Sequence, residues 1–215
     1  MAVIAIDGPA GAGKSTVAKQ VAMSTNLPYL DTGAMYRCVA HAVMQSGVNM
    51  ADPDAVGQVA ASARIVVERD SAELNGVDVS GIIRTPEVSS VVSIIAAHSP
   101  VRDAMRSQQR MWIESHGGGV VEGRDIGTVV FPHAELKIFL TASPEVRAQR
   151  RVSQTGGDVK EIAANIAERD RIDSTRSDSP LRPADDSILV DSSNRSITEV
   201  VNEIVHHFQE SQKAS

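Results

Sequence analysis

Apolar runs of strand length recur along the chain and are separated by segments with helical spacing. Between the first two runs, Val17 and Val21 repeat at i, i+4, which predicts a helix from Lys14 to about Ser24. Short apolar strands that alternate with helices are typical of a parallel sheet covered by helices on both faces. We therefore expect an α/β fold with a five-stranded parallel sheet, whose strands are residues 3–7, 28–31, 120–122, 136–141 and 187–191.

Several predicted helices begin with the same local signal, a capping side chain followed by proline. Proline lacks the N–H that the first helical turn leaves unpaired, and its fixed φ suits a helix. Residues 32–46 should form another helix that ends at Gly47, and the capping box at 196–199 should open the last helix, over about 197–210. The cap-proline pairs are Asp52-Pro53, Thr85-Pro86, Ser99-Pro100 and Ser143-Pro144.

The stretch 64–80 departs from this alternation of strands and helices. Its first part is β-branched at the centre, and Asn75-Gly76 is a tight-turn signal followed by Val77 and Val79 in alternation. This pattern predicts a small antiparallel sheet that is inserted between helices.

The composition is that of an ordinary globular domain, with 215 residues, 42% hydrophobic positions and a formal net charge of −6. No apolar run approaches the ~18 residues of a membrane span, and the apolar start at 1–6 lacks the basic residues of a signal peptide. Cys38 is the only cysteine, so no intrachain disulfide forms and a cytoplasmic location is expected. The acidic total argues against a nucleic-acid partner.

The cations are unevenly chosen and unevenly placed. The chain has 16 Arg and only 5 Lys, and eight of the arginines lie between Arg124 and Arg182. Because a guanidinium donates two parallel hydrogen bonds to a phosphate or carboxylate, a concentration of arginines is typical of sites for small anions. A general preference for arginine as the surface cation explains the composition equally well, so this alone decides nothing.

One motif carries specific chemistry. Residues 8–15 (GPAGAGKS) fit the phosphate-binding loop G-x-x-x-x-G-K-[ST], with an apolar strand before it and an amphipathic helix after it. Backbone N–H groups and the helix N-terminus should face the phosphates of ATP or GTP, with Lys14 at the β- and γ-phosphates and the Ser15 hydroxyl as a ligand for Mg²⁺. The residues expected to hold ATP here are Gly8, Pro9, Ala10, Gly11, Ala12, Gly13, Lys14, Ser15 and Thr16.

Other nucleotide-dependent classes fit the sequence less well. A GTPase needs an N-K-x-D segment that reads guanine, and none of the five lysines follows an asparagine. A motor or helicase needs a longer chain and an apolar strand that ends in adjacent acids, and the nearest candidate, 120–125 (VVEGRD), is interrupted. A nucleotide-controlled switch for a protein partner remains the alternative outside enzymes. A small kinase with a small acceptor is favoured.

The acceptor is expected to be a phosphate. A hydroxyl acceptor needs a general base, for which only Asp31 and Asp125 are candidates, whereas the phosphate of a nucleoside monophosphate is already ionised near neutral pH. Such an acceptor brings close to two negative charges, so its site needs several arginines. The arginine excess therefore favours a phosphate acceptor, and a hydroxyl acceptor remains the alternative among enzymes.

The later arginines flank a predicted lid. Residues 154–158 contain two glycines, which predicts a flexible link between two helices. Before it, Arg147, Arg150 and Arg151 follow i, i+3, i+4 spacing and should share one helix face, with Arg150 and Arg151 expected to reach ATP. A closing lid would bring these cations to the transferred phosphoryl group, together with others that follow the link. Those others are Arg169, Arg171 and Arg176.

Five segments resemble the bacterial cytidylate kinases, which are nucleoside-monophosphate kinases. The resemblance runs from Ile4 to about Asp191 and is specific because EGRDIGTVVFP occurs together with DTGAMYR. It implies a P-loop NTPase fold with a parallel-sheet core, an acceptor-binding part enlarged by a small antiparallel sheet, and a lid. It also implies phosphorylation of CMP and dCMP by ATP with Mg²⁺. The segments are GPAGAGKST (8–16), YLDTGAMYR (29–37), VSIIAAHSPVR (92–102), EGRDIGTVVFP (122–132) and LKIFLTAS (136–143).

The resemblance also implies roles for individual residues. Arg37 should hold the acceptor phosphate, Ser93 the cytosine and Asp173 the ribose, while Thr32 keeps the hydroxyl of a serine often found there. The residues expected to bind CMP are Thr32, Arg37, Ser93, Arg102, Arg124, Asp125, Asp173 and Arg176. Those expected to act in catalysis are Lys14, Arg124, Arg169 and Arg176.

The pair Arg124-Asp125 has a physical argument of its own. The exocyclic amino group of cytosine is a donor, for which a carboxylate is the natural acceptor, whereas uracil presents an oxygen at that position. Facing Asp125, this oxygen would create a polar mismatch that discriminates by about 10⁴. The alternative for these two residues is a surface ion pair worth about 0–1 kcal/mol.

One kinase domain accounts for the whole length. We expect a core at about 1–31, 100–150 and 177–215, an acceptor-binding insertion at about 32–99 and a lid at about 151–176. The expected partners are the small-molecule substrates ATP and CMP or dCMP, with no nucleic acid and no membrane. No sustained heptad pattern occurs, so a monomer is expected.

Overall fold

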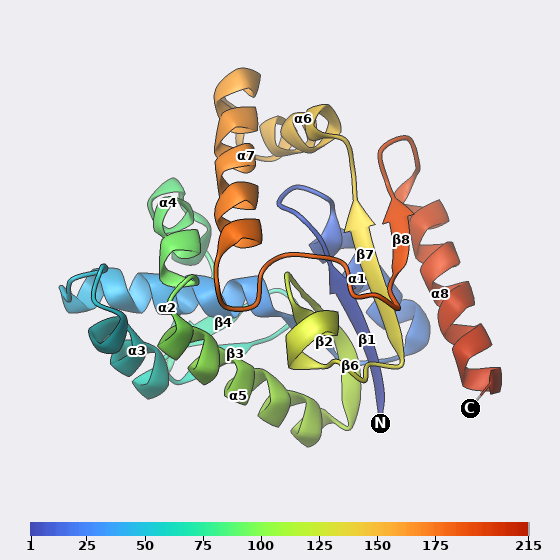
Figure 1. Cartoon of the computed structure of the whole chain (residues 1–215), viewed down its shortest axis with the longest axis horizontal. Helices are drawn as coiled ribbons and strands as arrows, with labels where there is room; N and C mark the ends of the chain where they lie inside the picture. Colours follow the sequence, from blue (N-terminus) through green and yellow to red (C-terminus); the bar gives the residue numbers. More distant parts are fainter. Residues whose placement is uncertain (215) are drawn as a thin grey trace.

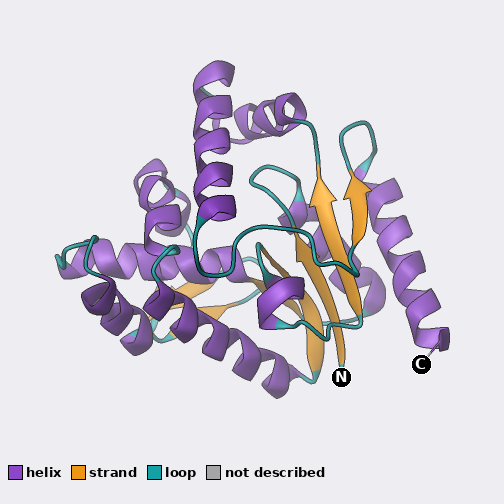
Figure 2. Ribbon diagram, in the orientation of Figure 1, coloured by secondary structure: helices purple, strands orange, loops and turns teal. Residues whose placement is uncertain are grey.

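A five-stranded parallel sheet forms the centre of the protein, in a computed structural model that describes residues 1–214. The strand order is β2-β6-β1-β7-β8, and every neighbouring pair is parallel. Figures 1 and 2 show the strands side by side with helices around them. The predicted α/β class and sheet are therefore confirmed. The strands are β1 (Ala2–Asp7), β2 (Tyr29–Asp31), β6 (Gly118–Gly123), β7 (Leu136–Thr141) and β8 (Ile188–Asp191).

The central strand β1 divides its side chains between two hydrophobic clusters. Ile4 and Ile6 belong to the cluster that contains residues of α1 (Lys14–Thr25) and α8 (Ile197–Ala214). Val3 and Ala5 belong to the other cluster, with helices from the insertion and α5. Because both faces are covered, the strand is apolar from Ala2 to Ile6, as a buried parallel strand requires. The helices of the second cluster are α2 (Thr32–Ser46), α3 (Pro53–Ser62), α4 (Pro86–Ile95) and α5 (Ser99–His116).

The helices begin at the predicted capping residues, except at α5. Asp52 caps α3 through the N–H groups of Asp54 and Ala55, and Ser143 caps α6. At α5 the prediction is wrong, because His98 is the cap and Ser99 already has helical backbone. The hydroxyl of Ser99 instead hydrogen-bonds Asp178, far along the chain.

The remaining two starts differ in their side-chain bonding. Thr85 stands at the cap of α4 without a side-chain bond to the helix. Ser196 and Glu199 form the expected capping box of α8, since Glu199 accepts from the N–H of Ser196 at 2.8 Å.

The insertion contains the predicted antiparallel sheet. Asn75 and Gly76 have φ of 54° and 82°, the left-handed values of a tight hairpin turn. Lys19 of α1 reaches over and pairs with Asp70 of the insertion at 2.7 Å. The sheet has the order β3-β4-β5 and is followed by the short helix η1. These elements are β3 (Ile65–Val67), β4 (Ala72–Leu74), β5 (Val77–Asp78) and η1 (Ile82–Arg84).

Two helices, α6 (Pro144–Thr155) and α7 (Val159–Thr175), stand above the carboxyl edge of the sheet (Figure 1). The link between them contains Gly156 and Gly157, with φ of 70° and 99°. The helix pair lies over the phosphate loop, and both described chain ends lie at the opposite, amino edge of the sheet. Within residues 1–214, every helix is too short or too polar to cross a membrane.

Candidate active site

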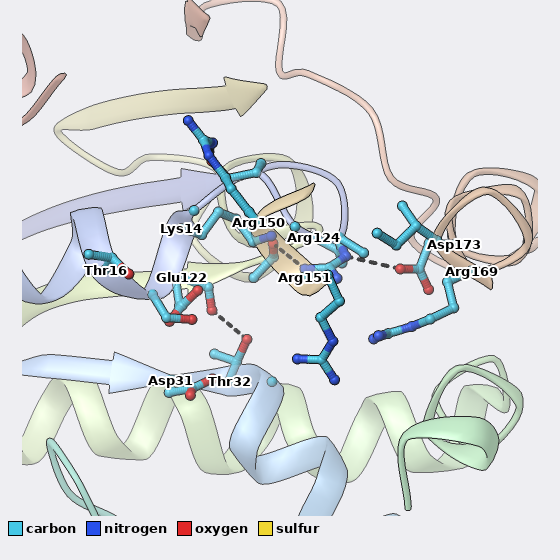
Figure 3. A pocket seen from close by; sticks show the side chains of 18 of the residues that line it. Lys14, Thr16, Asp31, Thr32, Glu122, Arg124, Arg150, Arg151, Arg169 and Asp173 are labelled. Atoms are coloured by element: carbon cyan, nitrogen blue, oxygen red, sulfur yellow. Dashed lines mark hydrogen bonds and ion pairs between the residues drawn. The ribbon is translucent and has the colours of Figure 1, made fainter. Parts of the chain in front are cut away.

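A cleft of about 920 Å³ opens at the carboxyl edge of the sheet, between the phosphate loop, the insertion and the two upper helices (Figure 3). Ten Lys or Arg side chains and four carboxylates line it. The cleft is therefore cationic, although the whole chain carries a net charge of −6. The arginine bias of the composition reflects a site and not only a surface preference.

The phosphate loop has the geometry that its glycines predict. Gly8 has φ of 153°, and a Cβ at that position would lie 2.0 Å from the carbonyl oxygen of Leu140. Gly13 has φ of 93° and caps α1, so the loop runs directly into the helix N-terminus. The Lys14 ammonium donates to the carbonyl of Pro9 at 2.8 Å, and burial together with Arg124 lowers the pKa of Lys14.

Asp7, the last residue of β1, connects the phosphate loop to the segment that follows β6. Its carboxylate accepts the N–H groups of Ile126 and Gly127 at 2.8 and 2.7 Å, at the start of the helical turn η2 (Ile126–Val130). Burial raises the pKa of Asp7 to about 6, against the lowering effect of these two hydrogen bonds. The loop and the Arg124-Asp125 pair are thus held at fixed positions relative to each other.

An acidic group lies beside Ser15. Glu122, at the end of β6, is 4% exposed and accepts the hydroxyl of Tyr29, while Ser15 is a further hydrogen-bond partner. Burial and the neighbouring Asp31 raise the pKa of Glu122. Thr32 donates to the Glu122 carbonyl at 2.6 Å. Glu122 was not among the predicted site residues, although its place at the end of an apolar strand was the available signal.

At the end of the cleft away from the phosphate loop, buried ion pairs join α5, η2 and α7. Arg102 donates to Asp125 at 2.5 Å, and Arg176 lies 3.6 Å from the other oxygen of Asp125. Asp173 accepts from Nε of Arg124 at 2.9 Å and lies 3.6 Å from Arg176 (Figure 3). Asp125 is 3% exposed and pairs with Arg102, while Arg124 pairs with Asp173, so the alternative of a surface ion pair between Arg124 and Asp125 is wrong.

Two further predicted acceptor residues line the same end. Arg37 donates to the carbonyl of Ile83 at 3.2 Å and to the hydroxyl of Ser89 at 2.8 Å, which fixes its guanidinium. Burial and the nearby Arg169 lower the pKa of Arg37 to about 10. Ser93, on α4, is buried and lines the cleft.

Two arginines of α6, Arg150 and Arg151, line the cleft but differ in their hydrogen bonding. Arg151 extends into the cleft, opposite Arg169 of α7 (Figure 3). Arg150 also lines the cleft, but its guanidinium donates to the carbonyl of Ala12 at 3.2 Å and to the carbonyl of Ser192 at 2.7 Å. Arg150 therefore supports the phosphate loop through a hydrogen bond to its backbone.

Arg147 and Arg171 do not join the cleft, which corrects the expectation for both. Arg147 is buried, donates to the carbonyls of Ala142 and Ala10, and pairs with Asp170. Arg171 is exposed and pairs with Glu168 one turn away on its own helix. Helical spacing predicted which residues share a face of α6, but it did not predict which groups pair with each arginine on that face.

The structure brings nearly all of the predicted site residues to one cleft. Besides Arg147 and Arg171, the predicted residues that do not line it are Gly8 and Pro9, at the start of the loop. The others lie around it, and they are Ala10, Gly11, Ala12, Gly13, Lys14, Ser15, Thr16, Thr32, Arg37, Ser93, Arg102, Arg124, Asp125, Arg150, Arg151, Arg169, Asp173 and Arg176.

Comparison of the sequence with known families and curated proteins gives a consistent result. The signature of the family described as cytidylate kinase matches residues 4–210. The chain is 48% identical to a cytidylate kinase of Desulforamulus reducens, with 94% of each chain covered, and 46% identical to one of Mycobacterium leprae, covering 93% and 92%. It is also 47% identical to a bifunctional pantoate ligase/cytidylate kinase of Prochlorococcus marinus, of which it spans 44%.

Solved structures with a similar fold are more distant in sequence. A gluconokinase from Sinorhizobium meliloti has a TM-score of 0.52 at 15% identity, with 97% of this chain and 92% of that chain covered. A shikimate kinase from Bacteroides thetaiotaomicron has a TM-score of 0.50 at 13% identity, covering 99% and 98%. At these identities the likeness shows the shared P-loop kinase fold alone.

Proposed function

The chain belongs to the cytidylate kinase family, and from this premise we propose that it transfers the γ-phosphoryl group of ATP to CMP and dCMP, giving ADP with CDP or dCDP. The observation that carries this proposal is the single cationic cleft. It joins a phosphate loop at one end to a buried Arg-Asp pair, Arg102 and Asp125, at the other. Donor and acceptor sites thus share one cavity, as direct transfer between them requires.

The donor end is suited to the triphosphate of ATP. The N–H groups of the loop and the N-terminus of α1 face the cleft, and Lys14 adds a point charge. Arg151 supplies a further cation from above, while Arg150 holds the Ala12 carbonyl in place. The lowered pKa of Lys14 rises again when phosphate enters, since an anion favours the ammonium form.

The acceptor end is suited to a cytidine monophosphate. Arg37 is the residue we assign to the acceptor phosphate, with Ser93 and Asp125 on the base and Asp173 near the ribose. Asp125 accepts a hydrogen bond from the Arg102 guanidinium through one oxygen, at 2.5 Å, and this supports a carboxyl group fixed in position to accept from the amino group of cytosine. The polar mismatch with uracil would then set the choice of base.

Catalysis in this site is positioning and charge stabilisation. The attacking phosphate oxygen is ionised near neutral pH, so the reaction needs no general base. Lys14, Arg124, Arg169 and Arg176 surround the space between donor and acceptor and would stabilise the negative charge that spreads over the transferred group. The ion pairs of Arg124 and Arg176 with Asp173 hold these two cations in place before the substrates bind.

Mg²⁺ is the cofactor that we propose for ATP. The oxygen donors beside the phosphate loop fit a hard cation, since the Ser15 hydroxyl, the Glu122 carboxylate and Asp31 lie together. Ser15 would hold the ion directly, and the two carboxylates would hold its water ligands. The ion neutralises phosphate charge when it is bound.

We also propose that residues 151–176 act as a lid over a core at 1–31, 100–150 and 177–215, with the acceptor side at 32–99, and that a monomer acts in the cytoplasm. The consecutive left-handed residues Gly156 and Gly157 support a lid that moves between α6 and α7. One chain supplies the whole cleft, which supports a functional monomer. Sedimentation velocity at assay concentration tests the oligomeric state.

Steady-state assays with CMP, dCMP, UMP, AMP and GMP as acceptors test the function. CMP and dCMP should be the preferred acceptors, and phosphorylation should require ATP. The matched control is Lys14→Met, which keeps the length of the side chain and removes its charge, and which should lower kcat by about 10³ or more. Absence of CMP turnover by the native chain would overturn the proposal.

A further inference from the structure

One ion pair outside the cleft joins two segments that are far apart in the chain. Arg106 of α5 donates to both oxygens of Asp178, at 2.8 and 3.3 Å. Asp178 lies just after α7, in the segment 176–181 that leads from the lid back to the core. The pair is two-pronged and its side chains are only 14% and 20% exposed, unlike an ordinary surface ion pair.

The segment 176–181 is held in an unusual backbone shape at this point. Ser179 is buried and has φ of 53°, a left-handed value for a residue other than glycine. Its hydroxyl receives a hydrogen bond from Arg106 at 2.9 Å and donates to Asp178 at 2.6 Å. The ion pair therefore maintains a turn that the backbone alone would not favour.

This turn fixes one arginine of the acceptor site directly. The Nε group of Arg176 donates to the carbonyl of Ser179 at 2.8 Å, and its other end lies 3.6 Å from both Asp125 and Asp173. Arg176 is therefore anchored at its stem by the turn and directed toward the cleft at its tip.

The same pair touches the second arginine of the acceptor site. The Nε group of Arg102 is buried, has no hydrogen-bond partner among the described residues, and lies 3.8 Å from the Asp178 carboxylate. Its terminal nitrogens donate hydrogen bonds to Asp125 and to the carbonyl of Ala96. Asp178 thus supplies the negative charge on the side of Arg102 that faces away from the cleft.

We propose that Arg106 and Asp178 are positioning residues for the acceptor nucleotide: their pair docks the segment 176–181 on α5 and thereby sets Arg102 and Arg176 around CMP. The inference rests on the proposed function. It adds two residues, outside the cleft, that contact neither ATP nor CMP and act through the two arginines.

The test compares Asp178→Asn with the native chain in steady-state kinetics. Loss of the charge should raise KM for CMP about tenfold, because a charge-assisted hydrogen bond is lost, and should leave KM for ATP within about twofold. Arg106→Gln should raise KM for CMP in the same direction but less, because it leaves the Asp178 charge beside Arg102. The double variant should be no worse than Asp178→Asn alone, since that change already removes the pair with Arg106.

The matched control is Asp103→Asn. Asp103 pairs with the same arginine at 2.5 Å, but it is 72% exposed and lies on the same helix as Arg106. Its loss should change neither KM by more than about twofold. If Asp178→Asn does not fold, Arg106→Lys takes its place, because lysine keeps the charge and loses the parallel second bond; KM for CMP should still rise several-fold.

Three results would overturn the inference: an unchanged KM for CMP, equal changes in both KM values, or equal effects of Asp178→Asn and Asp103→Asn. The native chain serves as the reference for the function itself. If it does not phosphorylate CMP, the proposed function fails, whereas normal turnover by the native chain together with an unaffected Asp178→Asn rejects the positioning role alone.

Discussion

The side chain of Asp170, on α7, accepts the backbone N–H of Ala10 in the phosphate loop at 3.0 Å. Arg147 of α6 donates to the carbonyl of the same residue at 3.0 Å and pairs with Asp170. Both backbone polar groups of one loop residue are therefore held by side chains of α6 and α7. The position of these two helices and the shape of the loop are coupled through Ala10.

Removing this contact should weaken catalysis without removing a cleft residue. Asp170→Ala should lower kcat/KM for ATP about tenfold, because the loop loses a charge-assisted hydrogen bond and Arg147 is left unpaired. Asp170→Asn, which can still accept from Ala10, should lose less. The control is Glu168→Ala on the same helix, whose carboxylate pairs only with exposed Arg171. Equal kinetics of the two alanine variants would contradict the coupling.

Asp125→Asn should change the choice of acceptor. An amide presents both a donor and an acceptor, so the variant should use CMP less well and narrow the difference between CMP and UMP. Some stability should also be lost, since Arg102 and Arg176 remain buried beside a neutral group. Competition assays with the two acceptors measure the selectivity. An equal loss for CMP and UMP would count against recognition of the base by Asp125.

Gly8→Ala should disrupt the phosphate loop. The added Cβ would lie 2.0 Å from the carbonyl oxygen of Leu140, on a strand that cannot withdraw, so we expect a loss of about 3 kcal/mol or more in the free energy of unfolding. Gly76→Ala is the control, because its φ of 82° gives the same type of strain without a neighbour within 4 Å. It should cost only about 1 kcal/mol in urea denaturation. Similar losses in the two variants would be inconsistent with a steric clash at Gly8.

The Arg106–Asp178 pair should give a specific acid dependence of stability. Burial raises the pKa of Asp178, but the hydrogen bonds from Arg106 and Ser179 outweigh it and lower the pKa to about 2. A carboxyl with a lowered folded-state pKa stabilises the fold above its unfolded pKa near 4 and loses this contribution as the pH falls toward 2. The free energy of unfolding of the native chain should therefore exceed that of Asp178→Asn by about 2 kcal/mol at pH 7, and this difference should shrink below pH 4. Urea denaturation at several pH values measures it, and a constant difference would refute the assignment.

Removal of the divalent cation should abolish turnover, and Glu122→Gln should raise the Mg²⁺ concentration needed for half-maximal activity. The reason is that a carboxylate beside Ser15 attracts the cation and its water ligands, whereas an amide carries no charge. Titration of activity with Mg²⁺ at saturating ATP gives the shift. The control is Glu114→Gln, an exposed acid of α5, which should leave the titration curve unchanged. An identical curve for Glu122→Gln would contradict the role of that residue at the cation.

Most of the fold was predictable because its signals are local. Apolar strands, the Asn75-Gly76 turn and the cap at Asp52 depend on neighbours within a few residues, and each occurs where the pattern predicts it. The cap at Ser99 failed for a non-local reason. Its hydroxyl hydrogen-bonds Asp178, which the chain brings next to α5 only after α7.

The candidate site divides in the same way. The phosphate loop and the Arg124-Asp125 segment are continuous motifs, so the sequence placed them correctly in one cleft. Arg147 was misassigned because a helix face does not reveal whether solvent, ligand or another carboxylate lies opposite it. The roles of individual residues on CMP stay predictions until a complex or kinetic data test them.

The two described ends of the chain lie at the amino edge of the sheet, and the cleft opens at the carboxyl edge (Figure 1). Because the sheet separates them, a second protein module or an affinity tag attached at either end would lie on the opposite side of the sheet from the cleft and from α6 and α7. This arrangement suits the chain to fusion with other catalytic domains and to oriented immobilisation on a surface.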